Sequence, residues 1–161
     1  MKGHKMKVLK VNPFLSGSEK IADRIVKVYI NSFAGYPWFE TWEYPKVMSD
    51  FRNEMTKENA KCWVVMKQEE VVAISWGYNN FQDFGQLLEG TPFYLDEVAV
   101  MQEYQKRGVG RMLFNEVLSQ ISAPVVLRTK FDSPMHKLVR QAGGYDIRKI
   151  SGDRVIAVIS K

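Results

Sequence analysis

The chain has 161 residues, of which 45% are hydrophobic and 25% are charged, a composition that excludes a disordered or low-complexity protein. It is long enough for one domain with a continuous core. No apolar run approaches the roughly 18 residues of a membrane-spanning helix, and the basic N-terminal segment has no signal-peptide pattern. We therefore expect a cytoplasmic protein with no membrane partner.

The formal net charge of +5 favours anionic partners, of which nucleic acid and a small polyphosphate are the candidates. The basic residues are interspersed with acids, so no charge tract supports a nucleic-acid surface and none is expected. The single cysteine, Cys62, excludes an internal disulfide and lies in an apolar run, which indicates a buried, inert thiol. With only His4 and His136 beside it, no Cys/His metal cluster can form, and no metal is expected.

The first part of the chain predicts a strand followed by two helices. Residues 6–11 alternate apolar and polar side chains, as a strand does. Ser16 and Glu19 have the spacing of a helix capping box and precede an apolar stripe with helical periodicity. After an aromatic loop, a second helix is expected with Pro45 near its start. Its apolar face consists of Val47, Met48, Phe51 and Met55.

The rest of the chain predicts a mixed sheet. Residues 61–67 and 71–81 indicate a hairpin, and further elements follow: a strand over 93–101, a helix over 109–121, a strand over 125–130, a short helix capped by Ser133 and Pro134, and a closing hairpin. The order β-α-α-β-β-β-α-β-α-β-β predicts a single α/β domain over residues 1–161, with a mixed sheet of the α+β kind.

The turn QKRGVG, residues 105–110, lies where the fourth strand leads into a helix. A helix N-terminus leaves backbone N–H groups without intrahelical partners, and its dipole favours negative charge. Gly108 and Gly110 let the backbone approach an anion, and Lys106, Arg107 and Arg111 add positive charge. The turn is neither a P-loop nor G-x-G-x-x-G. It therefore favours a phosphate or pyrophosphate, with close helix packing as the alternative reason for the glycines.

The segment LDEVAVMQEYQKRGVGRMLFNEVL resembles the core motif of the GCN5-related N-acetyltransferase (GNAT) superfamily. In that family a strand leads through [QR]-x-x-G-x-[GA] into a helix whose backbone holds the pyrophosphate of acetyl-CoA, and Gln105, Gly108 and Gly110 match the motif. The later segment SPMHKLVRQAGGYDI and the aromatic segment before the second helix are also similar to family members. The resemblance implies an acyl-CoA N-acyltransferase (GNAT) fold and an N-acetyltransferase that uses acetyl-CoA and acetylates a primary amine of a small molecule or peptide.

The resemblance and the charge pattern together assign a set of residues to acetyl-CoA. The family holds the acetyl group and pantetheine arm on the backbone of a splayed strand, which implies a role for residues 98–100 here. The expected cofactor-binding residues are Val98, Ala99, Val100, Gln105, Lys106, Arg107, Gly108, Val109, Gly110, Arg111, Ser133 and His136. For His136, in the first turn of the short helix, we expect a solvent-facing or cofactor-side position rather than proton transfer.

The strand over 93–101 carries two candidate catalytic carboxylates, Asp96 and Glu97. Its apolar alternation slips by one residue there, between the pair Phe93 and Leu95 and the pair Val98 and Val100. A β-bulge produces such a slip and would turn both carboxylates towards one side. We expect Asp96, and then Glu97, to act as general base or amine anchor. A salt bridge to a nearby cation is the alternative role for each.

The last helix departs from the family pattern. Many members have a tyrosine five residues before the aromatic residue of the final Gly-aromatic pair, and it assists departure of the sulfur. Here that position, counted from Tyr145, is Arg140. Arg140 would stabilise the thiolate electrostatically, or a hydroxyl from Ser133 or Tyr104 would reach the sulfur. Tyr145 itself is expected to pack in the core.

The aromatic segment YPWFETWEY, residues 36–44, is the predicted border of the acceptor site. Glu40 and Glu43 would attract a cationic amine and Trp38 or Trp42 would stack on it, unless the rings cover the core and the glutamates face solvent. The overall positive charge does not favour a strongly cationic acceptor, unless the site is locally acidic. A catalytically silent acyl-CoA-binding or regulatory domain is the alternative function, and a homodimer is a possible assembly.

Overall fold

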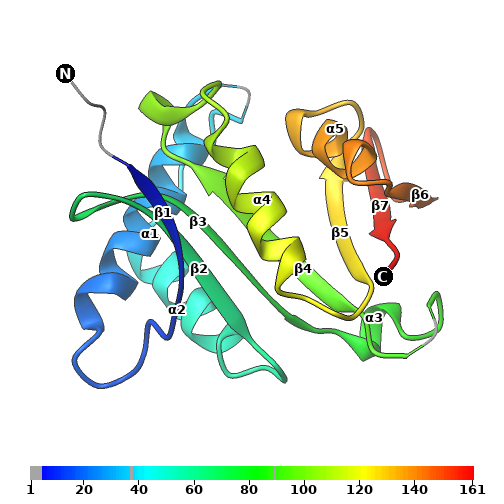
Figure 1. The fold of residues 1–161 in the computed structure, drawn as a ribbon, viewed down its shortest axis with the longest axis horizontal. Helices are drawn as coiled ribbons and strands as arrows, with labels where there is room; N and C mark the ends of the chain where they lie inside the picture. The colour runs from blue at the N-terminus through cyan, green and yellow to red at the C-terminus, as the bar shows by residue number, and fades with distance from the viewer. Residues whose placement is uncertain (1–4, 37, 89) are drawn as a thin grey trace.

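The computed structural model describes residues 5–36, 38–88 and 90–161 (Figure 1). The elements are β1 (Met6–Val11), α1 (Glu19–Ala34), α2 (Tyr44–Glu54), β2 (Lys61–Lys67), β3 (Glu70–Asn79), α3 (Phe81–Phe84), β4 (Phe93–Val100), the 3₁₀ turn η1 (Gln102–Tyr104), α4 (Val109–Ser119), β5 (Val125–Lys130), α5 (Pro134–Gln141), β6 (Tyr145–Lys149) and β7 (Arg154–Ile159). Among the described residues, no helix has both the length and the apolar character to cross a membrane.

The seven strands form one sheet in the order β1-β2-β3-β4-β5-β7-β6. All neighbours are antiparallel except β4 and β5, which are parallel. These two strands pair only at Phe93 with Val125 and at Tyr94 with Val126. Beyond this point β4 continues to Val100 and β5 to Lys130 without pairing to each other, so the sheet splays open between them (Figure 1).

Helices cover both faces of the sheet. In Figure 1, α4 lies in front of the sheet, and α1 and α2 lie behind it. Alternating side chains of β2 supply both cores: Trp63 and Val65 pack with the α4 side chains, whereas Cys62 and Val64 pack with α1 and α2. Helix α5 shares the α4 core through Val139. The burial of Cys62 confirms the predicted inert thiol, and burial also raises the pKa of that thiol.

The predicted order of elements is confirmed, with the short α3 and η1 as additions. The predicted capping box at Ser16 is wrong: Ser18 is the N-cap residue of α1, and its side chain makes no capping bond. Gly17, with φ of 89°, turns the chain just before it, and its N–H donates to the Glu19 carboxylate at 3.3 Å. This turn places the helix start two residues later than the pattern predicts.

Tyr145 contradicts a second prediction, because it is 49% exposed rather than packed in the core. It begins β6, which is the edge strand of the sheet and pairs only with β7 among the described strands. Four of the five β6 residues are exposed, and the middle one is half-buried. An edge strand has a neighbouring strand on one side only, which leaves the Tyr145 ring half in solvent.

Candidate active site

The predicted bulge in β4 is present. Trp76 of β3 pairs with Glu97, and the next residue, Gly77, pairs with Leu95, so Asp96 is the extra residue. A Cβ at Gly77 would collide with the Tyr94 carbonyl oxygen, which explains the glycine opposite the bulge. The Ser75 hydroxyl donates to the Glu97 carbonyl oxygen at 2.8 Å and supports the distorted segment. As predicted, the bulge changes the phase of the strand at this point.

Residues on either side of the bulge therefore share one face of the sheet. Four side chains face the α4 core, and they are Phe93, Leu95, Val98 and Val100. Ala99 packs on the other side, with α1 and α2. Asp96 and Glu97 are half-buried between these two sets. Burial first, and then the charges of Glu97 and Asp96 among others, raise the pKa of Tyr29 on α1. Both carboxylates thus lie towards the α1 and α2 side, as the slip predicts.

A third carboxylate, Glu54 from the last turn of α2, joins them. The Trp76 indole N–H donates a hydrogen bond to Glu54, and Glu54 also shares a hydrogen bond with Asp96. The Tyr78 hydroxyl donates to the other side of this group, to Asp96 Oδ2 at 3.2 Å. We call Glu40, Glu54, Asp96 and Glu97 the carboxylate cluster.

The electrostatics of the cluster are those of crowded, partly desolvated acids. Burial, then the hydrogen bond and charge of Asp96, raise the pKa of Glu54 to about 8. Burial, then the charges of Asp96, Glu54 and Glu40, hold the pKa of Glu97 well above its usual range, and Arg154 at the start of β7 opposes them. With a pKa of about 8, Glu54 is largely protonated at neutral pH, so the cluster carries less than its full negative charge until a cation binds beside it.

Aromatic rings line the cluster. Tyr29 stacks on Trp76 with ring centroids 5.9 Å apart and meets Trp42 edge-on at 5.8 Å. The Trp42 indole N–H donates to Glu40 Oε1 at 3.2 Å. Of the predicted acceptor residues, Glu40 and Trp42 thus belong to the site, whereas Glu43 is exposed before α2.

Trp38 lies at a different border of the site. Its ring is 5.7 Å from Lys130 Nζ at the end of β5, and Lys130 forms an ion pair with Asp153 in the β6–β7 turn at 3.5 Å. Lys130 therefore lies between the loop that joins α1 to α2 and the turn of the terminal hairpin. Pro37, in the same loop, lies outside the described residues, as does His4.

The glycine turn forms the start of α4, as predicted. Gly108 is the N-cap residue, with φ of 83°, and the first helical bond runs from the Met112 N–H to its carbonyl oxygen at 3.0 Å. No atom lies within 4 Å of the position that a Cβ on Gly108 would take. The positive φ, not crowding, thus explains this glycine, and it leaves open space beside the N-terminus of the helix.

The turn is tied to the splayed strand. Gln105 Nε2 donates to the Val100 carbonyl oxygen at 2.9 Å, so its side chain positions the loop. A Cβ at Gly110 would lie 3.6 Å from Val100 Cγ2, an ordinary contact. Val109 is buried beneath the turn. The exposed cations of the turn are Lys106, Arg107 and Arg111.

These features fit a pyrophosphate. The backbone N–H groups at the start of α4 have no acceptor within the helix, and the helix dipole places positive potential there. The open space beside Gly108 and the surrounding cations suit a doubly charged anion. The adjacent splayed edge of β4, at residues 98–100, is a continuous extension of this site.

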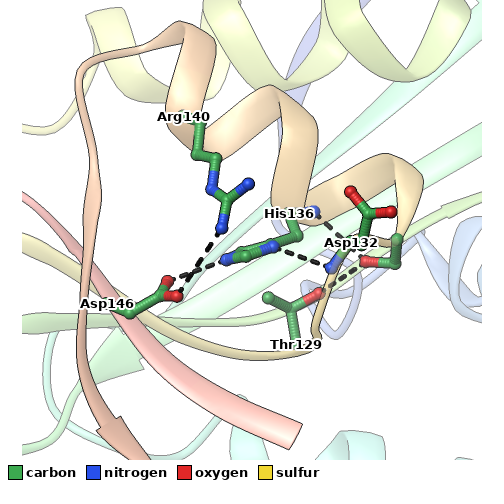
Figure 2. A network of polar contacts seen from close by, with 6 residues as sticks. Thr129, Asp132, His136, Arg140 and Asp146 are labelled. Atoms are coloured by element: carbon green, nitrogen blue, oxygen red, sulfur yellow. Dashed lines mark hydrogen bonds and ion pairs between the residues drawn. The ribbon is translucent and has the colours of Figure 1, made fainter. Parts of the chain in front are cut away.

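The predicted solvent-facing or cofactor-side position of His136 is wrong. Its side chain is fully buried under α5, where Nδ1 accepts from the Asp132 N–H at 2.8 Å and Nε2 lies 2.8 Å from Asp146 Oδ1 (Figure 2). Because Nδ1 is an acceptor, the ring is neutral and Nε2 carries the proton that it donates to Asp146. His136 therefore joins α5 to β6 and cannot reach a ligand in solvent.

Ser133 belongs to the same network, as does Arg140, which is labelled in Figure 2. Ser133 caps α5 by accepting from the His136 N–H at 3.2 Å, and its hydroxyl is 3.1 Å from Thr129 Oγ1. Arg140 is half-exposed, with Nη2 at 4.0 Å from Asp146 Oδ2 and its guanidinium over the Phe131 ring. Of the three residues predicted for the site in this segment, Arg140 is the one with an exposed charge.

Glu54 is the site carboxylate that was not predicted from the sequence, and Tyr29, Trp76 and Tyr78 beside it were not predicted either. Val47, Phe51 and Glu54 occupy positions i, i+4 and i+7 of α2, so Glu54 lies on the same face as the two buried residues of this helix. A carboxylate on the apolar stripe of a helix is a signal of a buried functional group. This signal was present in the sequence.

A family model described as the Acetyltransferase (GNAT) family matches residues 24–141, which is more than half of the chain. The chain belongs to the GNAT family of acetyltransferases. Membership implies the use of acetyl-CoA, in agreement with the anion-binding geometry of the turn. No curated protein matches the sequence at a significant level.

Solved structures share the GNAT fold over nearly the whole chain. A Pyrococcus horikoshii protein matches with a TM-score of 0.76 at 15% identity, covering 98% of this chain and 99% of that one. An acetyltransferase from Thermus thermophilus matches at 0.71 and 16%, covering 98% of each chain. The ribosomal-protein-S18-alanine N-acetyltransferase from Escherichia coli matches at 0.66 and 14%, covering 98% of this chain and 96% of that chain. At these identities the likeness concerns the fold alone.

Proposed function

We propose that this GNAT protein transfers the acetyl group of acetyl-CoA to a primary amine that binds as an ammonium ion at the carboxylate cluster. The observation that carries the proposal is the position of the cluster, which lies on the bulge of the strand that splays open beside the glycine turn. The net charge of the chain does not favour a cationic acceptor, but an ammonium ion would relieve the repulsion among the crowded acids of this site. The aromatic lining supports it, because rings attract ammonium groups.

The chain's own residues would divide the work in a simple way. The backbone N–H groups at the start of α4 would hold the pyrophosphate, with Lys106, Arg107 and Arg111 around it. The unpaired edge of β4 at residues 98–100 would hold the thioester end. When bound, acetyl-CoA supplies an activated thioester carbonyl. Asp96 would anchor the ammonium group within reach of that carbonyl.

Departure of the thiolate is assigned to Arg140. Its charge is half-exposed near the β5 end of the splay, whereas the Ser133 hydroxyl is engaged by α5 and Tyr104 is buried. A free thiol titrates near pH 8.5, so the thiolate is an adequate leaving group when a cation lies nearby. Arg140→Ala is expected to lower turnover, and Arg140→Lys to retain part of it.

The first experiment measures binding and thiol release on the same preparation. Calorimetry with acetyl-CoA and CoA is expected to give micromolar affinity. A thiol reagent then follows CoA release with primary amines, tertiary amines and N-acetylated amines. The buried Cys62, the one cysteine of the chain, keeps the background low. Release with primary amines alone supports the proposal.

Two outcomes would reject it. Binding of acetyl-CoA without thiol release for any amine would indicate a silent acyl-CoA-binding domain instead. Turnover that is unaffected by Asp96→Asn would remove the carboxylate cluster from the acceptor site. The matched control is Asp50→Asn, which changes an exposed aspartate of α2 that is paired with Lys46. A cytoplasmic location and a homodimer remain predictions.

A further inference from the structure

Glu54 holds a position in the site to which no role was assigned from the sequence. It comes from α2, the helix that packs on the α1 side of the sheet, and reaches the β4 bulge from outside the strand. The Trp76 indole N–H donates to one of its oxygens, and the carboxyl is hydrogen-bonded to Asp96. Trp76 is itself buried between Tyr29 and Phe51, so the donor is held rigidly.

The ionisable groups that face Glu54 come from three elements and one loop. Asp96 and Glu97 lie on β4, Tyr29 on α1 and Tyr78 on β3. The cation near it is Lys57, just after α2, whose Nζ lies over the Tyr78 ring at 4.2 Å. An ammonium ion beside Asp96 would therefore lie next to Glu54, whose carboxyl is oriented by the buried Trp76 indole.

We propose that Glu54 accepts the proton that the ammonium acceptor must lose, while Asp96 remains the anchor. This inference rests on the proposed function. The Trp76 N–H bond stabilises the ionised form of Glu54, which is the form that accepts a proton. Asp96 instead accepts a hydrogen bond from the Tyr78 hydroxyl at Oδ2, which holds it beside Glu54.

The acid strength of Glu54 suits this role. An alkyl ammonium titrates near pH 10, so an ordinary carboxylate is a poor acceptor for its proton. With its pKa raised to about 8, Glu54 is much closer in pKa to the ammonium group whose proton it accepts. A bound cation also favours ionisation of the neighbouring carboxyl, so binding of the acceptor would prepare the base.

The transfer of the acetyl group conserves protons and electron pairs. One N–H bond of the ammonium breaks, the proton moves to a Glu54 oxygen, and the nitrogen lone pair attacks the thioester carbonyl carbon. The C–N bond forms and the C–S bond breaks with its electron pair on sulfur. A second proton leaves nitrogen and neutralises the thiolate, and Glu54 returns its proton to solvent.

The test compares pH–rate profiles of wild-type protein, Glu54→Gln and Trp76→Phe with one primary amine. In wild type, kcat/KM is expected to rise as Glu54 ionises near pH 8 and to fall again where the amine loses its charge. Glu54→Gln is expected to lower kcat by about 10²–10⁴-fold and to abolish the rising limb, with acetyl-CoA affinity unchanged. Trp76→Phe, which lacks the N–H donor, is expected to move the rising limb up by roughly one pH unit.

The controls separate this inference from the proposed function. Glu58→Gln alters an exposed glutamate four residues further along the chain and is expected to leave both kcat and the profile unchanged. Wild-type kcat in Glu54→Gln would overturn the role of Glu54 and leave the proposed function standing. Absence of thiol release from wild type with every amine would overturn both. If Trp76→Phe does not fold, Glu54→Asp replaces it, with a lower kcat and a retained rising limb as the expected result and wild-type kcat as the contrary one.

Discussion

Glu54 is a carboxylic acid on the inward face of an amphipathic helix, and its ionisation opposes folding. Its pKa is about 8 in the folded protein and near 4.5 in the unfolded chain. Between these values the folded state binds more protons, so the free energy of unfolding falls as pH rises and then levels off above pH 8. The slope is at most about 1.4 kcal/mol per pH unit, and less because the group is partly solvated.

Glu54→Gln is therefore expected to flatten the pH dependence of stability between pH 5 and pH 8, since glutamine does not ionise. Urea unfolding of both proteins at pH 5, 6.5 and 8 measures this. The wild type should lose stability relative to the variant as pH rises. Parallel curves for the two proteins would show that Glu54 is not the buried acid that titrates in this range.

His136 is the other residue whose surroundings decide its role. His136→Ala removes a buried ring and leaves the Asp132 N–H and the Asp146 carboxylate without this partner. We expect a loss of about 2–4 kcal/mol in the free energy of unfolding, with little change in acetyl-CoA affinity. Lys137→Ala, an exposed neighbour on α5, is the control. A folded His136→Ala protein with tenfold weaker acetyl-CoA binding would instead place His136 on the cofactor.

The elements differ in how far the sequence predicts them. The phase slip at Asp96 and Glu97 was visible because apolar side chains flank it on both sides, and the structure has the bulge there. The burial of His136 could not be predicted from the sequence, because its partner Asp146 lies on β6 and reaches it only when the chain folds back. Glu54 was not predicted because helical periodicity is assigned from apolar residues, and one polar residue on the stripe does not change that pattern.

The start of α4 allows a test of the glycine turn with a matched control. Gly108 and Gly17 have φ values of 83° and 89°, and neither has an atom within 4 Å of the position that a Cβ would take. Valine at either site is strained by the backbone alone, so both variants are expected to lose similar stability. Only Gly108→Val is expected to weaken acetyl-CoA binding, by tenfold or more in calorimetry. Equal affinities in the two variants would reject the turn as the pyrophosphate site.

At the scale of the whole molecule, charge is distributed unevenly. The basic turn before α4 and the carboxylate cluster lie at opposite ends of the splayed part of β4, although the chain as a whole carries +5. An anionic co-substrate and a cationic acceptor would thus be drawn to the two ends of one strand. Rising salt is expected to increase KM for both substrates more than it changes kcat, in initial-rate measurements from about 0.05 to about 0.5 M NaCl.

Because only two residue pairs join β4 to β5, the sheet consists of two parts that are weakly connected to each other. Strands β1–β4 form one ladder and β5–β7 another, and the bonds between the ladders end at Tyr94 and Val126. Beyond that boundary the facing amides of β4 and β5 have no partner in the other ladder, so solvent can reach them without unfolding of either one. A ligand that occupies the opening would contact both strands and limit their movement apart. Acetyl-CoA is therefore expected to slow amide hydrogen exchange in β5 as well as in β4, although the glycine turn belongs to neither strand.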